Sequence, residues 1–484
     1  MGRFFAVAGG QTVSIIGSSF TDFAIPLWIY LQTGSVARFA VLAVLGLVPG
    51  MLIAPLAGAV VDRYDRRAVM MAGDLAAGGG VLALGLVAVT GGLHIGLVYG
   101  LIAWLSTALM LQRLAYNSAI PQLVPKRNLG HANGFFQLTG GAMVFLVPLT
   151  AIALLGTIGM GGILLVDAFS YAVAIAILAV VRFPRTMGFR RRESLGQEIA
   201  GGLRYSVGQR SFRGMLLYFM VLNIFLSPML LLVSPLLLTF TDLHTVVRVS
   251  MACGVAGMAG GLTLTVWGGP RRRRMRGILL VSLFLAVAGA VTGAQGSAGL
   301  VGAGAVAMTF GMVLLNGVYA TIIQTKVPQR FHGRVIALNT VAAWCTLPLG
   351  WAVVAPLGSR LFERLLADGG PLNGSVGALV GTGPGRGIGL LYMVLAALMT
   401  TLVAVAARTA VLRHFDDDVP DAEPDDLVGL RALQARVPGL RSGGPAGGLR
   451  SGRPADAPEV GLRSGGPEVE SLALSQRSRR GDEA

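Results

Sequence analysis

Long apolar runs dominate this sequence and constrain its fold more than any other feature. Each run has 19 to 25 residues, and a helix that crosses the hydrocarbon core of a membrane needs about 20. The 484-residue chain is 54% hydrophobic and only 13% charged, with a mean hydropathy of +0.70, whereas a soluble protein carries about 25% charged residues. The sequence therefore predicts an all-α integral membrane protein with twelve transmembrane helices rather than a soluble helical enzyme. The predicted spans are 8–31, 39–61, 68–90, 93–113, 135–156, 159–181, 215–239, 248–268, 277–295, 298–320, 335–357 and 386–407.

Basic residues are distributed unevenly between the two sides that these spans define. Of the 30 Lys and Arg residues before residue 414, 25 fall on one side if the spans alternate in direction. Loops rich in Lys and Arg stay in the cytoplasm, so we expect both termini to be cytoplasmic and the protein to be a multi-pass protein of the cell membrane. The formal net charge of +16 does not indicate nucleic-acid binding, because the charges occupy short loops between apolar runs.

Four segments follow from this pattern. Residues 1–181 and 215–413 each hold six predicted spans, and residues 182–214 form a long cytoplasmic connection between them. Residues 414–484 differ in composition and repeat a Gly-Leu-Arg-Ser-Gly unit. Gly, Pro and Ser bury too little surface to offset the entropy of ordering, so we predict a disordered cytoplasmic tail.

The two halves also resemble each other. A shift of 203 residues places Pro125-Lys-Arg-Asn-Leu-Gly130 on Pro328-Gln-Arg-Phe-His-Gly333. The same shift places Gly58 on Gly261. Two similar six-span units in the same orientation form a parallel repeat about an axis along the membrane normal. Such a repeat predicts a cavity between the halves that is exposed to alternate sides as the halves rock.

A compact charged loop lies between the second and third spans, Gly58-Ala-Val-Val-Asp-Arg-Tyr-Asp-Arg-Arg67. Its Gly-x-x-x-Asp-Arg-x-x-Arg-Arg pattern resembles the signature of the major facilitator superfamily. With Asp65 included, the loop reads Asp-Arg-x-Asp-Arg-Arg, and this form resembles the branch of macrolide-efflux and enterobactin-export proteins. Pro121-Gln-Leu-Val-Pro125 and Gly333-Arg334-Val335 are similar to further features of that branch. The resemblance covers about residues 4–412 and implies two six-helix bundles of the major facilitator fold.

The resemblance implies a gating role for the charged loop. It implies that Asp62 bonds to backbone groups and basic residues and helps to hold the outward-facing state; the alternative is a solvated charge that sets only the topology. Arg66 and Arg67 are either partners of Asp62 or anchors on the cytoplasmic side, and Arg113 either completes the charge cluster or interacts with the membrane surface alone. The second-half counterpart of the loop, residues 260–274, lacks an acid. The predicted gating residues are Gly58, Asp62, Arg63, Arg66, Arg67 and Arg113.

Polar residues inside the spans are candidates for coupling and substrate contact. Asp22 lies within the first span, and an acid in the membrane by default faces the bundle interior or a wet cavity. We therefore expect Asp22 to couple transport to protons or to bind a cation, unless it lies near enough to the interface to stay hydrated. Asn223 and Asn316 either line the cavity or join helices. Asp74 and Asp167 are interpreted first as structural hydrogen-bonding groups, with proton relay as the alternative.

No motif for other chemistry accompanies these residues. The sequence has no phosphate-binding loop, no metal-ligand spacing among its histidines and no hydrolase constellation. We expect a secondary transporter that is not an enzyme, needs no cofactor or metal, uses a proton gradient, exports amphipathic small molecules and functions as a monomer in the lipid bilayer. An uptake permease of the same fold and a non-transporting membrane scaffold or sensor that uses the tail remain alternatives.

Overall fold

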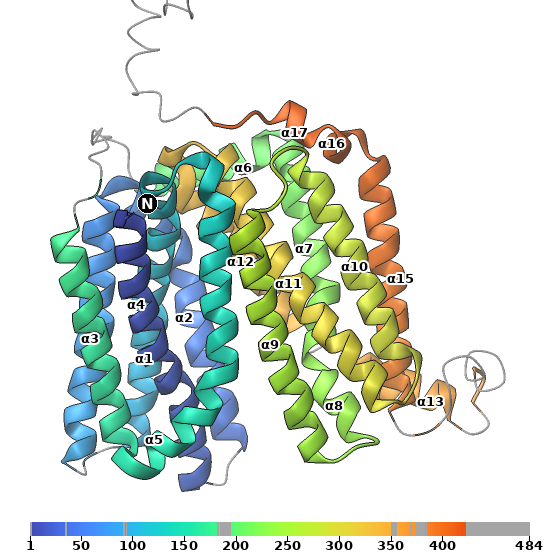
Figure 1. The fold of residues 1–484 in the computed structure, drawn as a ribbon, viewed down its shortest axis with the longest axis horizontal. Coiled ribbons are helices and arrows are strands. Elements are labelled where there is room, and N and C mark those ends of the chain that lie inside the picture. The colour runs from blue at the N-terminus through green and yellow to red at the C-terminus, as the bar shows by residue number, and fades with distance from the viewer. Residues whose placement is uncertain are drawn as a thin grey trace, which may run out of the picture. The chain divides into compact units, whose positions relative to one another are not determined.

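The computed structural model describes residues 2–33, 36–90, 92, 94–181, 183, 195–349, 356–367, 370–372, 383 and 385–422. Within these ranges all regular secondary structure is helical (Figure 1). The first half contains α1 Gly2–Thr33, α2 Val36–Arg63, α3 Arg66–Val89, α4 Ile95–Leu123, the 3₁₀ turn η1 Lys126–Asn128 and α5 Leu129–Val180. The second half and its lead-in contain α6 Leu195–Gly208, α7 Arg210–Leu231, α8 Val233–Leu238, α9 Leu243–Trp267, α10 Arg274–Ala294, α11 Ala298–Lys326, η2 Gln329–Phe331, α12 His332–Leu349, η4 Leu357–Phe362, α13 Glu363–Leu366, α15 Arg386–Arg408, α16 Ala410–Arg413 and α17 Phe415–Asp418.

Nine segments in the described part of the chain are long and apolar enough to cross a membrane. They coincide with nine of the predicted spans. The other three predictions, 8–31, 135–156 and 335–357, fall on α1, on the first part of α5 and on α12, and residues 350–355 of the last lie outside the described residues. The all-helical membrane fold is confirmed, whereas the count of twelve and the cytoplasmic termini stay predictions.

Glycine and proline explain two breaks in the helices. The predicted spans 135–156 and 159–181 are two limbs of α5 that meet at Gly159, whose φ of 65° is a conformation that only glycine adopts readily. The predicted span 215–239 is divided into α7 and α8 around Leu232. Pro235 follows this break, and its ring nitrogen cannot donate the hydrogen bond of a continuous helix.

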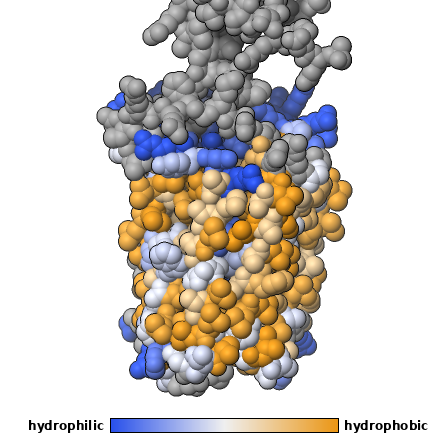
Figure 2. Space-filling view, turned by 90° about the vertical axis from the view of Figure 1, so that its left-hand side faces the viewer, coloured by the Kyte–Doolittle hydropathy of each residue, from blue (hydrophilic) through white to orange (hydrophobic). Residues whose placement is uncertain are grey.

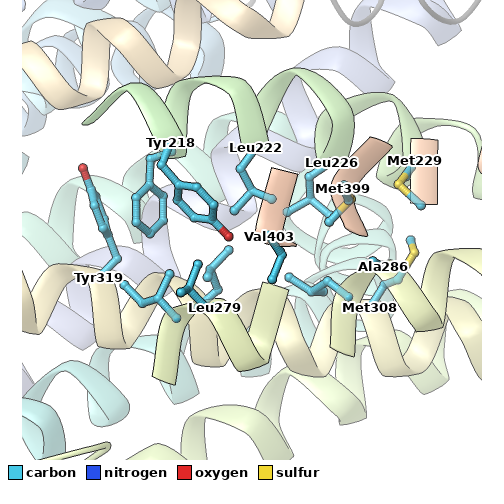
Figure 3. Packing of buried hydrophobic residues seen from close by; sticks show 14 of the residues in the cluster. Tyr218, Leu222, Leu226, Met229, Leu279, Ala286, Met308, Tyr319, Met399 and Val403 are labelled. Carbon is cyan, nitrogen blue, oxygen red and sulfur yellow. The ribbon is translucent and has the colours of Figure 1, made fainter. Parts of the chain in front are cut away.

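Each half packs around its own apolar core. In the second half, Tyr218 and Leu222 of α7 lie among Leu279 of α10, Met308 of α11 and Met399 of α15 (Figure 3). Phe219 is also buried in this cluster, and Phe225 packs against it. Two clusters join α1 to α5 of the first half in the same way, and one of them also includes Ala337 of α12. Their packing gives two helical units whose mutual contacts define the site below.

Apolar side chains also cover the outside of the helical part. Figure 2 shows them across the middle of one face, with hydrophilic residues at both ends. Leu75 and Leu86 of α3 and Phe169 and Val180 of α5 are among the exposed large apolar residues. A surface of this kind is stable in contact with lipid, where apolar residues face outward.

The predicted connection 182–214 contains more structure than its composition indicated. Residues 182 and 184–194 lie outside the described residues, and α6 Leu195–Gly208 follows them. α7 begins at Arg210, so the helix of the seventh span starts before residue 215. The first bundle boundary at 181 coincides with the end of α5.

The start of the predicted tail requires a correction, because residues 414–422 pack against the second half. Phe415 is fully buried, and Asp416 lies 3.6 Å from the Lys326 ammonium and accepts a 3.0 Å hydrogen bond from the Met275 backbone N–H. The Lys326 ammonium also donates to the Val419 carbonyl oxygen. A buried ammonium needs an opposite charge, and the segment after the last span provides it. The prediction of disorder from residue 423 onward falls outside the described residues.

We predict that a chain ending after His414 is less stable than the full chain, whereas a chain ending after Ala422 is not. Removing a buried Phe typically costs about 3–5 kcal/mol, and Lys326 would also lose its carboxylate. Thermal unfolding of both truncated chains in detergent micelles measures the difference. Equal unfolding temperatures for the chain ending at His414 and the full chain would contradict this account of the segment.

Candidate functional site

The candidate site is the region where the two halves meet at the end of the molecule that carries Asp62. Gly58 allows α2 to approach α12, since a Cβ atom at this position would lie 2.6 Å from the Gly333 carbonyl oxygen and 2.8 Å from the Ala337 Cβ. The glycine of the charged loop therefore has a packing role: it brings the end of α2 against the start of α12. We call this region the α2–α12 crossing.

Asp62 accepts hydrogen bonds across this crossing. Its carboxylate accepts hydrogen bonds from the Gly333 N–H at 2.8 Å and from the Arg334 N–H at 3.2 Å, and the Arg334 Nε–H donates to it at 3.1 Å. The Asp62 side chain has no exposed surface. The first N–H groups of a helix lack partners within the helix, and its N-terminus favours an anion. α12 begins at His332, so Asp62 binds the positive end of a helix from the other half as well as a guanidinium.

The arginines of the charged loop contact different parts of the molecule. Arg66 has a nitrogen 3.9 Å from an Asp62 carboxylate oxygen and donates to the Gln329 carbonyl oxygen at 3.1 Å, so it does contact the other half. Arg67 instead donates to the Leu178 and Ala179 carbonyl oxygens at 2.6 Å each, at the C-terminus of α5. The alternative in which Arg67 pairs with Asp62 is therefore wrong. The third arginine, Arg63, is exposed at the end of α2.

Arg113 lies apart from this charge cluster. Its guanidinium carbon is 5.7 Å from the centre of the Trp344 ring on α12, a separation at which a cation is attracted to the face of an aromatic ring. Arg113 thus contacts the other half through an aromatic ring, and none of its described contacts is with Asp62.

A second crossing joins α5 to α9 and is related to the first by the internal repeat. The shift of 203 residues places Asp62 on Thr265 and Arg334 on His131. In the structure the His131 Nδ1 lies 2.7 Å from the Thr265 carbonyl oxygen, so equivalent positions meet at both crossings. A Cβ atom on Gly134 would lie 2.2 Å from the Thr265 backbone nitrogen. The α5–α9 crossing is therefore a close backbone contact without a carboxylate.

Buried amides form a third set of contacts between the halves. Asn133 of α5 donates to the Thr321 hydroxyl at 3.0 Å and to the Gln324 side-chain oxygen at 2.8 Å. Gln137 of α5 donates to the Val313 carbonyl oxygen at 3.2 Å. The sequence analysis did not predict this pairing of Asn133 with Gln324. The only available signal was the repeat, which brings the loop after the fourth span opposite α11.

The acids inside the first half have distinct surroundings. Asp167 is buried and accepts hydrogen bonds from Thr21 at 2.6 Å and Ser18 at 3.2 Å. Asp74 is buried beside Gln11, whose side-chain amide donates to it at 3.0 Å. Asp22, next to Thr21, is exposed, and no side chain or backbone group in the described ranges hydrogen-bonds to it. The arrangement places one exposed carboxylate near a buried, hydrogen-bonded one.

The two candidate amides of the second half differ in exposure. Asn223 is half-buried and donates to the Phe219 carbonyl oxygen of its own helix at 2.8 Å, whereas Asn316 of α11 is exposed. Within the described ranges, no group of three His, Cys, Asp or Glu side chains is arranged to hold a metal ion.

Comparison with known proteins agrees with this architecture. A family model described as Major Facilitator Superfamily matches residues 7–353. The chain belongs to the major facilitator superfamily. It is 24% identical over 371 residues to macrolide efflux protein A of Streptococcus pyogenes, covering 74% of this chain and 90% of that protein. It is 26% identical over 368 residues to the multidrug efflux pump Tap of Mycobacterium tuberculosis, covering 72% of this chain and 84% of that protein.

Solved structures show the same fold at low sequence identity. A bacterial homologue of the iron transporter ferroportin, in its outward-facing state, matches with a TM-score of 0.64 and 15% identity over 86% of this chain and 99% of the other. The fucose:proton symporter of E. coli matches with a TM-score of 0.58 and 12% identity over 84% of this chain and 98% of the other. The resemblance to the superfamily and to its macrolide-efflux branch is confirmed, and the chain is a multi-pass membrane transporter.

We predict that Asp62 and Arg334 stabilise the protein as a coupled pair. Asp62→Asn and Arg334→Gln should each lower the thermal unfolding temperature, since hydrogen bonds to charged groups contribute about 1.5–3 kcal/mol. The double variant should lose less than the sum of the two single losses. Asp65→Asn is the matched control, because exposed Asp65 caps α3 in the same loop and makes no described contact with the other half. Additive losses for Asp62 and Arg334 would show that the pair does not interact.

Proposed function

We propose that this chain is a proton-coupled exporter of amphipathic small molecules that works by alternating access. Membership in the superfamily supports a transporter rather than an enzyme. The names of its relatives, a macrolide efflux protein and a multidrug efflux pump, support export of drugs, antibiotics, siderophores or similar natural products. We further propose that it acts in the cell membrane as a monomer, without a bound cofactor.

The observation that carries this proposal is the set of hydrogen bonds that Asp62 accepts across the α2–α12 crossing, which we call the latch. The carboxylate belongs to one half, and the three N–H groups that it accepts from belong to the other. A rocking motion that opened this end would separate them and expose a buried charge to water. Such a contact differs between the two states and can therefore bias their equilibrium. A static scaffold has no need for a charged contact that only one conformation provides.

The acid cluster of the first half provides a route for coupling. Exposed Asp22 lies beside Thr21, and the Thr21 hydroxyl donates to buried Asp167. An acid within a membrane span is by default a functional group that faces the bundle interior or a wet cavity, and chains of such acids serve as proton relays. We assign Asp22 the exchange of a proton or cationic substrate with the cavity and Asp167 a supporting role through Thr21 and Ser18. Asn316, exposed on α11, is the corresponding candidate for substrate contact in the second half.

Transport into inside-out vesicles with an imposed pH gradient tests the proposal. We expect gradient-dependent accumulation of a fluorescent cationic drug or a macrolide by the unmodified chain, and a loss of at least tenfold in Asp22→Asn, because an amide cannot release a proton. Asp65→Asn is the matched control and should retain transport. Full gradient-dependent transport by Asp22→Asn would exclude Asp22 as the coupling acid.

The same vesicles separate export from the alternatives. An uptake permease would accumulate substrate in intact cells rather than in inside-out vesicles. Removing residues 423–484, beyond the packed segment, should leave transport unchanged. A chain that is correctly inserted but transports none of these compounds would contradict the proposed export function.

A further inference from the structure

A charged cavity lies at the α5–α9 crossing. It has a volume of about 620 Å³ and lies between the segment that joins α4 to α5 and the segment that joins α9 to α10. Thr321 of α11 and Asp421 of the packed segment after α17 complete its wall. We call it the basic cleft; its charged lining residues are Lys126, Arg127, Arg271, Arg274 and Asp421.

Positive charge in the basic cleft exceeds negative charge and comes from both halves. Lys126 and Arg127 belong to the first half, and Arg271 and Arg274 belong to the second. In the described part of the chain, neither Lys126, Arg127 nor Arg271 forms an ion pair. Four cations around one cavity repel one another, so an anion placed among them would be strongly attracted.

Arg274 is a second, independent feature of the basic cleft, because one of its buried donors is unsatisfied. One of its terminal nitrogens donates to the Thr325 hydroxyl at 2.8 Å and lies 3.4 Å from the Asp421 carboxylate. Its Nε is buried without a hydrogen-bond acceptor. A buried donor without a partner is costly. A guanidinium with an unsatisfied Nε can donate two parallel hydrogen bonds to two oxygens of one phosphate group.

Backbone at the start of α5 also lines the basic cleft. Asn128 and Gly130 form part of the cavity wall, and the Asn128 N–H donates to the Pro125 carbonyl oxygen at 2.8 Å. Gly130 also lies against the opposite wall, because a Cβ atom there would be 1.7 Å from the Gly268 carbonyl oxygen. Both walls of the basic cleft are therefore held together by direct backbone contact between the halves.

We propose that the basic cleft binds a phosphate-bearing anion, either the head group of an anionic lipid or a soluble phosphate. Lys126 and Arg127 bind it from one half and Arg271 and Arg274 from the other. This binding site is separate from the latch at Asp62 and from the acids near Asp22. It does not depend on the direction of transport or on proton coupling.

The proposed anion has a defined consequence for the two halves. At the α2–α12 crossing, Asp62 provides the negative charge that joins the halves. At the α5–α9 crossing the equivalent contact is between the His131 ring and the Thr265 carbonyl oxygen, and no carboxylate takes part in it. A bound phosphate would supply the missing negative charge there. Because it contacts both halves only when this end is closed, it would stabilise the closed arrangement by mass action.

Asp421 limits this binding from within the chain. Its carboxylate lies 3.4 Å from Arg274 and 3.7 Å from Lys326, and it stands at the wall of the same cavity. It therefore partly neutralises the charge that an anion would use. Asp421→Asn should strengthen anion binding, whereas loss of a basic side chain should weaken it.

Isothermal titration calorimetry of the purified full chain in neutral detergent micelles tests the proposal. The probes are inorganic phosphate and dioctanoyl phosphatidylglycerol, with dioctanoyl phosphatidylcholine as the zwitterionic control. Lys126→Gln and Arg271→Gln should each weaken binding roughly fivefold, the effect of about one basic residue near an anionic lipid. Arg272→Gln is the matched control, because Arg272 is exposed in the same loop and does not line the cavity.

The outcomes distinguish the source of the anion and decide the proposal. Saturable binding of phosphatidylglycerol alone identifies a membrane lipid, and saturable binding of phosphate alone identifies a soluble ligand. In either case binding must weaken in the Lys126 and Arg271 variants and strengthen in Asp421→Asn. Equal losses in Arg271→Gln and Arg272→Gln, or no saturable binding of either probe, would overturn the proposal.

Discussion

A single buried carboxylate holds the most polar contact between the two halves. Asp62 has no exposed side-chain surface and accepts three hydrogen bonds from Gly333 and Arg334. Burying a carboxylate is unfavourable unless it is paired and hydrogen-bonded, so the position of α12 against α2 follows from this requirement. Gly58 permits the close approach, and Arg66 extends the contact to Gln329.

The internal repeat makes the two crossings comparable and shows how they differ. Equivalent positions meet at both, yet the first has a carboxylate and a guanidinium where the second has a carbonyl oxygen and an imidazole. Glycines compensate at the second crossing by bringing α5 and α9 into backbone contact, as at Gly134. One crossing thus depends on charge and the other on close packing. This difference is consistent with unequal roles for the two crossings when the halves move.

Much of the fold followed from the sequence, because apolar length and glycine position are local properties. The turn at Gly159 and the motif at Gly58 lay where the pattern placed them. The pairing of residues far apart was harder to predict. Asp62 could be singled out as a gating candidate, but the choice of its partner among Arg66, Arg67 and Arg334 depends on helix packing that no local pattern encodes. The packed segment at Phe415 was missed because its acidic composition resembles that of a disordered tail, whereas its counter-charge, Lys326, lies 90 residues earlier.

The distance between the halves at the end carrying Asp62 tests the central claim most directly. Spin labels at Tyr64→Cys and Arg413→Cys, both exposed positions on different halves, report this distance by double electron–electron resonance after Cys253 and Cys345 are replaced by Ala. With Asp62 present, a narrow distance distribution is expected. In Asp62→Asn the distribution should broaden and shift to longer distances, because the α2–α12 crossing loses its charged contact. An unchanged distribution would contradict the role of Asp62 as the latch between the halves.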